Sequence, residues 1–252
     1  MSGEEMLSKQ SGGQCYEVAT PGSPPETKVD GQYYEVATPG SLSEKLVATA
    51  RDRVYGDFLR LCAPKASDTI LDVGVSDVVG EAANVIERRY PAPDKITAAG
   101  LGQGEAFKVW FPKIQYRQII ANHPLPFGNG SFDIVTANAV LEHVGSIENQ
   151  RFFVSELMRV GGCVYITVPN RFFPVEHHTA IPFLHWFDAT FALASRALGK
   201  AKWAASENLI LMSRQRLKAV SPTDRTVQIG MTGLMLGPCS SNLYLFAPAS
   251  RS

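Results

Sequence analysis

The sequence lacks an excess of charge of either sign. Its 252 residues include 24 lysines and arginines and 24 aspartates and glutamates, so the formal net charge is zero. A protein that follows the phosphates of a nucleic acid normally carries a strongly basic surface. The balance of charges therefore predicts that nucleic acid is not a partner.

Cysteine is scarce, and the four cysteines lie far apart in the sequence. Cysteines that hold zinc usually come in pairs at short spacing, and the sequence contains no such pair. We interpret them as free thiols in a reducing compartment, most of them filling the core. They are Cys15, Cys62, Cys163 and Cys239.

A long uninterrupted apolar run is also missing. The longest apolar stretch, residues 181–198, contains His185, Asp188 and Arg196, and we expect that it does not span a bilayer. The first residues show no basic segment leading into an apolar one, as a signal peptide would. Together these absences predict a cytoplasmic protein with no stable insertion into a membrane.

The N-terminal segment, residues 1–41, is polar and rich in Gly, Ser and Pro, and we expect it to be flexible. It contains a repeat, because Tyr16–Ser23 and Tyr34–Ser41 both read YEVATPGS. Two copies are too few for a solenoid. Either the repeat is a tandem duplication at a tolerant terminus, or its second copy folds over a ligand as a lid.

Strand and helix patterns alternate after this segment, in a chain long enough for one α/β domain with additions. Continuous apolar strands indicate a parallel sheet covered by helices on both faces. The expected strands are residues 70–73, 95–101, 114–119, 132–137, 163–168, 227–236 and 242–246. The expected helices are residues 43–61, 79–90, 104–111, 147–160, 181–198 and 207–220. The first of these helices should have Leu46, Ala50, Val54, Phe58 and Leu61 on one face.

The segment Thr69–Gly80 contains the first strand, a turn and the start of a helix. Gly74 lacks a Cβ where the chain turns sharply and where a ligand can approach the backbone. The first N–H groups of the helix form a site for polar or anionic groups. Asp72 lies inside an apolar strand, and we expect the N–H groups of the turn to be its hydrogen-bond donors.

Several motifs resemble those of one enzyme family. Leu71-Asp72-Val73-Gly74 resembles the first motif of class I S-adenosylmethionine (SAM) dependent methyltransferases. Residues 125–127 (LPF), 131–135 (SFDIV) and 139–144 (AVLEHV) resemble later motifs of its small-molecule, type 11-like members. The resemblance is good over about residues 45–185. It implies an enzyme that transfers a methyl group from S-adenosyl-L-methionine to an oxygen or nitrogen of a small-molecule acceptor.

The resemblance also implies an architecture for residues 42–252. The fold class is α/β: a Rossmann-like, doubly wound, mostly parallel seven-stranded sheet with a C-terminal antiparallel strand pair and helices on both faces. Residues of about 169–220 would be an insertion on the acceptor side. This interpretation also allows a homodimer.

The expected cofactor contacts follow the carboxyl ends of the parallel strands. They are Asp72, Gly74, Val75, Ser76, Leu101, Gly102, Gln103, Asn122, His123 and Asn138. Three positions depart from the family pattern. Ser76 occupies the position of a second Gly. The second strand does not end in the usual carboxylate, for which Gln103 could substitute. Asn122 occupies the position where the family often has an Asp near the adenine. We expect weaker cofactor binding than in a member with both carboxylates, or a compensating contact.

Three rival interpretations stay open. The run Gly100-x-Gly102-x-Gly104 resembles the glycine-rich turns that hold the pyrophosphate of a dinucleotide. The departures from the family pattern would also suit a catalytically inactive methyltransferase-like binding protein. A third possibility is a peripheral membrane enzyme that uses the apolar residues 181–198 to act on a lipid-linked acceptor.

The acceptor should dock after the fifth strand, beside residues 169–178. Its expected contacts are Asn170, Arg171, Phe172 and Phe173. His177 and His178 are candidates for a base near neutral pH, or else parts of a packed loop. His143 either orders the cleft floor or acts as a base, and Glu142 reads as a helix-start or surface group. We expect no metal, because Glu176, His177 and His178 are adjacent and rarely converge on one ion.

Overall fold

The computed structural model describes residues 42–77, 83–176, 178–179 and 181–249. Seven strands form one sheet. They are β1 (Ile70–Val73), β2 (Ile96–Gly100), β3 (Gln115–Gln118), β4 (Phe132–Asn138), β5 (Gly161–Pro169), β6 (Gln228–Leu236) and β7 (Cys239–Ala247). Their order is β3-β2-β1-β4-β5-β7-β6. Neighbours among β1 to β5 pair in parallel, whereas β7 pairs antiparallel with both β5 and β6. The predicted Rossmann-like sheet with its C-terminal antiparallel pair is confirmed.

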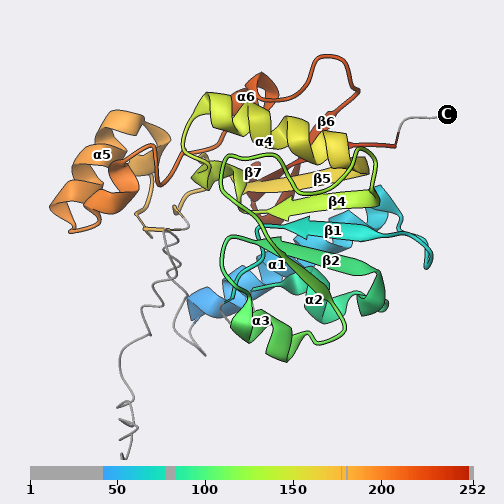
Figure 1. Ribbon diagram of the computed structural model, residues 1–252. Helices are drawn as coiled ribbons and strands as arrows, with labels where there is room; N and C mark the ends of the chain where they lie inside the picture. The colour runs from blue at the N-terminus through green and yellow to red at the C-terminus, as the bar shows by residue number, and fades with distance from the viewer. Residues whose placement is uncertain (1–41, 78–82, 177, 180, 250–252) are drawn as a thin grey trace, which may run out of the picture.

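Helices cover both faces of this sheet (Figure 1). They are α1 (Leu42–Cys62), α2 (Val85–Arg89), α3 (Glu105–Trp110), α4 (Ile147–Val160) and α6 (Arg214–Ala219), while α5 (Asp188–Ala197) lies apart from both faces (Figure 1). The alternation of side chains along β1 explains the two layers. Leu71 packs into a core with Leu157 of α4 and Leu217 of α6. Ile70 points the other way, into a core with Phe58 of α1 and Phe107 of α3.

A third, smaller core lies outside these two layers. It consists of Ile181, Phe191, Trp203, Leu209 and Leu211. Figure 1 shows its helix, α5, apart from the other helices and beyond the ends of the strands. The chain enters this region directly after β5, at the end of the sheet where ligands of parallel sheets bind.

Three expected helices are shorter or different in the structure. The described part of the helix predicted over 79–90 is α2 alone, and residues 78–82 lie outside the described part. Ala83 and Asn84 are not helical, because Asn84 has φ +53° and its side chain is bound elsewhere. In α1, which has the predicted apolar face, Leu46 at the start of the helix is 47 % exposed.

The helix predicted over 181–198 is an α-helix only from Asp188 to Ala197, preceded by a single 3-10 turn, Leu184–Trp186. Pro182 pairs with Val175 in an isolated antiparallel bridge, so this part of the chain is extended. Similarly, the helix predicted over 207–220 is restricted to α6. Ser213 caps it by accepting a hydrogen bond from the Arg216 N–H. The repeat within residues 1–41 lies outside the described residues. No helix in the described part of the chain has the length and apolar character needed to cross a membrane.

Candidate functional site

The turn after β1 contains the first predicted cofactor residues. Gly74 has φ +94°, and a Cβ at this position would overlap the side chain of Val140. The N–H groups of Gly74 and Val75 both donate to the Ala99 carbonyl oxygen of β2, over 2.7 and 3.2 Å. The expectation that these N–H groups would donate to Asp72 was therefore wrong, because they form hydrogen bonds with the neighbouring strand β2 instead.

Hydrogen bonds with the side chain of Asn84, just before α2, fix the backbone of Ser76. Its N–H donates to the side-chain oxygen of Asn84 over 3.0 Å, and the Asn84 amide donates back to the Ser76 carbonyl over 2.7 Å. One residue on, the Asp77 carboxylate accepts a hydrogen bond of 2.7 Å from the Phe107 N–H of α3. The backbone of residues 74–77 is thus held by three different elements.

Asp72 lies on the face of the sheet covered by α1 and α2, next to a second buried carboxyl group. Burial, and then the negative charge of Glu87, raise the pKa of Asp72 well above its ordinary value, while the Arg51 cation opposes the shift. Burial also raises the pKa of Glu87 to about 7. Both carboxyl groups therefore keep their protons to a higher pH than exposed carboxyl groups do.

The glycine-rich turn after β2 holds an aromatic ring. Gly104 has φ +70°, and a Cβ there would lie 2.6 Å from ring atoms of Tyr116 in β3. The Tyr116 hydroxyl donates to the Gly102 carbonyl over 2.7 Å, and the Leu101 carbonyl accepts a hydrogen bond from Gln118. Since this ring accounts for the glycines, the run gives no support to dinucleotide binding.

Gln103 is exposed at the same turn and lines an open groove of about 470 Å³. The groove is also lined by Lys108, Tyr116, Arg117, Gln118, Pro126 and Phe127. Asn122 and His123 are likewise exposed and follow β3, with Asn122 at φ +57°. The His123 ring nitrogen Nδ1 lies 2.8 Å from the Ala121 carbonyl oxygen.

Asn138 ends β4, at the middle of the carboxyl edge. Its side-chain oxygen accepts hydrogen bonds from Arg51 of α1 and from the Thr167 hydroxyl of β5. Sequence reasoning did not find Arg51, because nothing in its local pattern separates it from other helix cations. Its charge also acts on Asp72, Glu142 and His178, so it lies near the centre of the site.

Two predicted histidines meet in the structure. His143 lies in the 3-10 turn Leu141–His143 that follows β4, and His178 lies in the segment after β5. Their Nε2 atoms are 3.2 Å apart, and the rings meet edge to face. Trp203 packs against the His178 ring with centroids 4.9 Å apart. His177 lies outside the described residues.

The opposite nitrogen of each ring is anchored. His143 Nδ1 lies 2.7 Å from the Asn208 carbonyl oxygen, and His178 Nδ1 lies 2.8 Å from a Glu176 carboxylate oxygen. Glu176 also accepts hydrogen bonds from the N–H and the hydroxyl of Thr179. Both rings are therefore oriented with Nε2 toward a common point.

The charges around this point are uneven. Burial and the nearby His178 lower the pKa of His143 to about 4. Burial would also lower the pKa of His178, but its hydrogen bond to Glu176 outweighs that effect and raises it. Burial would raise the pKa of Glu176, yet its hydrogen bonds to His178 and Thr179 lower it to about 2. Glu176 and His178 thus form an ion pair, beside a neutral His143.

Glu142 was expected at a helix start or on the surface, and this was wrong. Only 1 % of it is exposed, because the segment after α5 crosses it and the Ile210 N–H donates to its carbonyl oxygen. Neither oxygen of its carboxylate has a hydrogen-bond donor among the residues that the structure describes. Burial raises the pKa of this carboxyl group to about 7.

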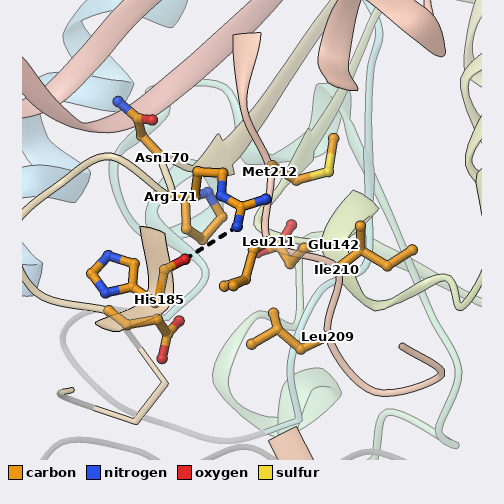
Figure 2. Close-up of a pocket in the computed structure, with 10 residues that line it drawn as sticks. Glu142, Asn170, Arg171, His185, Leu209, Ile210, Leu211 and Met212 are labelled. Atoms are coloured by element: carbon orange, nitrogen blue, oxygen red, sulfur yellow. Dashed lines mark hydrogen bonds between the residues drawn. The ribbon is translucent and has the colours of Figure 1, made fainter. Parts of the chain in front are cut away.

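The predicted acceptor residues divide into buried and exposed positions. Asn170 is buried and donates to the Ser240 carbonyl. Arg171 is buried as well, and its guanidinium donates to the Asp188 carboxylate over 2.9 Å. Figure 2 shows this guanidinium in a small pocket of about 10 Å³, hydrogen-bonded to the His185 carbonyl oxygen. The same pocket is lined by Glu142 and Glu176.

The two phenylalanines of this segment differ from each other. Phe172 is exposed, and its ring lies under the Arg171 guanidinium at 5.9 Å. Phe173 is half-buried, and its carbonyl oxygen accepts a hydrogen bond from His185 Nε2. Only Phe172 therefore offers a large free apolar surface, and the role of all four residues in acceptor binding stays a prediction.

Comparison with known proteins identifies the class of this fold and site. Residues 71–166, less than half of the chain, match the family model described as "Methyltransferase domain". Among proteins of curated function, none matches the chain. The match agrees with the predicted methyltransferase class over these residues.

Solved structures share the fold at low sequence identity. A SAM-dependent methyltransferase from Thermotoga maritima, a possible histamine N-methyltransferase, is 13% identical, with a TM-score of 0.53 over 83% of this chain and 92% of that one. The methyltransferase domain of bacterial CtHen1 is 12% identical, with a TM-score of 0.52 over 80% of this chain and 99% of that one. The CurJ carbon methyltransferase is 16% identical, with a TM-score of 0.53 over 84% of this chain and 56% of that one. These likenesses confirm the fold and leave the acceptor open.

Proposed function

We propose that this protein transfers a methyl group from S-adenosylmethionine to an oxygen or nitrogen atom of a small-molecule acceptor. One observation carries the proposal: groups suited to the two substrates meet around Arg51. This cation lies close enough to act electrostatically on Asp72, after which the cofactor turn begins, and on His178, on the acceptor side. Both sides lie at the carboxyl edge of the sheet.

The residues on the cofactor side fit an amino-acid nucleoside. Arg51 supplies a cation for the carboxylate of the ligand, and the carboxyl group of Asp72 offers acceptor oxygens for its ammonium group. Gln103 lines the groove beyond the second strand, where its amide can bond to hydroxyl groups. Gln103 thereby replaces the carboxylate that the family pattern would supply at the end of the second strand.

S-adenosylmethionine supplies a methyl group that is already activated. The protein therefore has to hold the acceptor in line, exclude water, and remove a proton from a hydroxyl or ammonium acceptor. His178 suits the last task once it has released its own proton. Glu176 holds the Nδ1 side of the ring, and the Nε2 atom, which points to His143, then has a lone pair that can take the proton.

A direct assay tests the proposed reaction. Methyl-labelled S-adenosylmethionine is incubated with the full chain and a panel of small hydroxylated, phenolic and amine acceptors, and products are detected by mass. We expect one chemical class of acceptor to gain a methyl group. Calorimetry with S-adenosylmethionine and S-adenosylhomocysteine runs in parallel. Binding of neither at millimolar concentration would overturn the enzyme and favour a catalytically inactive binding protein.

The surface around α5 favours a second candidate function, the methylation of a lipid-linked acceptor. Large apolar side chains are exposed along this segment: Phe172, Val175, Phe183, Leu184, Phe187, Leu193 and Leu198. Apolar side chains gathered beside an acceptor site suit an apolar or lipid-bearing molecule. Co-sedimentation with phospholipid vesicles tests this candidate, and a protein that stays in the supernatant contradicts it.

A further inference from the structure

Three side chains from two distant segments converge beside the cofactor edge. They are Glu142 and His143 from the turn after β4, and His178 from the segment after β5. One carboxylate oxygen and the two Nε2 atoms all lie within 4.8 Å of one another. The Nε2 atoms are 3.2 Å apart, and Glu142 Oε1 lies 3.9 Å from His143 Nε2.

The anchoring of both rings fixes their tautomers. The Asn208 carbonyl oxygen can only accept, so His143 Nδ1 carries a proton. The Glu176 carboxylate likewise accepts from His178 Nδ1. In neutral rings, both Nε2 atoms then present lone pairs to each other across 3.2 Å. Such an arrangement requires a cation between them, either a proton on His178 or a metal ion.

Glu142 provides a second, independent indication of a ligand. It is almost completely buried, and neither carboxylate oxygen has a donor within the described chain. A buried carboxylate without a partner is costly, and the usual partners are a cation or a metal ion. A proton placed between the two histidines would leave this carboxylate unpaired, whereas a divalent ion would satisfy all three groups.

We propose that Glu142, His143 and His178 form a binding site for a divalent metal ion of the zinc type. Tetrahedral zinc with bonds of about 2.0–2.1 Å to nitrogen separates two ligand atoms by about 3.3 Å, close to the observed His143–His178 spacing. The Glu142 carboxylate has to move toward the two Nε2 atoms to complete the site. Imidazole ligands favour zinc or a late transition metal over magnesium or calcium.

The surroundings of the three ligands match those of metal-bound histidines. A metal-ligating histidine nearly always donates its other ring N–H to a carboxylate or a backbone carbonyl. Glu176 does this for His178, and the Asn208 carbonyl does it for His143. We therefore assign Glu176 a positioning role. Trp203 packs against both rings and forms an apolar wall beside the ligands.

Three protein ligands leave a fourth coordination position open. This step rests on the proposed function: an acceptor oxygen bound there would be held near the methyl donor, and its hydroxyl proton would be easier to remove. The acceptor would then be a molecule with a hydroxyl group able to bind a metal. Metal binding itself does not depend on the proposed function, and it is measured without S-adenosylmethionine.

The experiment uses the full chain, stripped with a chelator and dialysed. Calorimetric titration with Zn²⁺ should give one site per chain, and Co²⁺ should give the visible absorption typical of a tetrahedral ion. Zn²⁺ should also raise the melting temperature, because a ligand of the folded state stabilises it. His178→Asn and Glu142→Gln should each weaken Zn²⁺ binding at least about tenfold, as should Glu176→Gln through its effect on His178.

His123→Ala is the matched control, because it removes an exposed histidine that follows β3 rather than β4 or β5. It should leave the Zn²⁺ affinity unchanged. Circular dichroism confirms the fold of each variant before titration. The Co²⁺ spectrum of the wild-type chain keeps the test valid even if a variant does not fold.

Two results would overturn the metal site. One is a folded wild-type chain that binds neither Zn²⁺ nor Co²⁺ stoichiometrically, which leaves the shared proton as the cation between the rings. The other is tight binding that persists in folded His178→Asn and Glu142→Gln chains. Either result leaves the methyl-transfer assay untouched, because that assay and S-adenosylmethionine calorimetry are performed separately. Conversely, zinc binding without any methyl transfer would overturn only the proposed reaction.

Discussion

Arg51 of α1 donates a hydrogen bond to the side-chain oxygen of Asn138 at the end of β4, 87 residues further along the chain. The same oxygen accepts a hydrogen bond from Thr167 of β5. The first helix is thereby tied to the two central strands of the sheet. As a result, a cation is held at the edge where the ligands of parallel sheets bind.

Replacing Arg51 by Ala should weaken the binding of S-adenosylmethionine by roughly tenfold or more, because a hydrogen bond to a charged group contributes about 1.5–3 kcal/mol. Isothermal titration calorimetry measures the effect. Arg53→Ala is the control, since Arg53 is exposed on the same helix and makes only a long hydrogen bond of 3.4 Å to Gly233. Equal affinities of the two variants would contradict a role for Arg51 in cofactor binding.

The Asp72–Glu87 pair should make stability depend on pH. Burial raises the pKa of Glu87 in the folded chain to about 7, above its ordinary value of 4.5. A raised carboxyl pKa contributes stability that is fully present below about pH 4.5 and is lost as the pH rises through 7. Glu87→Gln should flatten this fall in the free energy of unfolding, by on the order of 1–3 kcal/mol.

Urea unfolding at pH 5 and at pH 8 measures this difference. Glu142 also lowers the free energy of unfolding as the pH rises, because burial raises its pKa to about 7 as well. The wild-type dependence should therefore be reduced but not abolished in Glu87→Gln. Glu148→Gln, which changes an exposed carboxylate at the start of α4, should leave the dependence as it is. A wild-type chain whose stability does not fall over this range would contradict the raised pKa values of Glu87 and Glu142.

Adding a Cβ at a residue with positive φ can destabilise the fold through backbone strain and through steric overlap. Gly104→Ala and Gly130→Ala distinguish these two effects. Both glycines have positive φ, but a Cβ on Gly130 would meet nothing within 4 Å, whereas one on Gly104 would meet the Tyr116 ring. Gly130→Ala should cost about 1–2 kcal/mol for backbone strain alone. Gly104→Ala should cost clearly more in the same denaturant titration. Similar costs would mean that Tyr116 does not fill the turn as described.

The sheet could be predicted from the sequence because its signals are local. Ile70–Val73 is apolar and is ended by Gly74, and Ile147–Val160 follows Ser146, which caps the helix through the Asn149 N–H. Both elements have the predicted bounds. The helix predicted over 181–198 was wrong at its start, because a bridge between Pro182 and Val175 outweighs the apolar pattern.

The site was predictable only in part. The LEH motif places His143 after β4, and the segment after β5 contains His178, yet no local pattern shows that their Nε2 atoms meet. The burial of Glu142 depends on a segment that returns about 70 residues later and covers it, with Ile210 bonded to its carbonyl. Such long-range contacts depend on tertiary packing, which cannot be predicted from the hydrophobic periodicity of a single segment.

His178→Ala should lower the rate of methyl transfer by a factor of roughly 10²–10⁴, the usual contribution of a general base, while the affinity for S-adenosylmethionine stays within about twofold. The reason is geometric, since the ring lies on the acceptor side and is held there by Glu176 and Trp203. Single-turnover kinetics with saturating cofactor measures the rate, and calorimetry measures the affinity. Ser155→Ala, on the exposed side of α4, should change neither quantity. A His178→Ala chain with wild-type turnover would show that neither a base nor a metal ligand is needed there. A parallel loss of cofactor affinity would instead move His178 from the acceptor side of the site to the cofactor side.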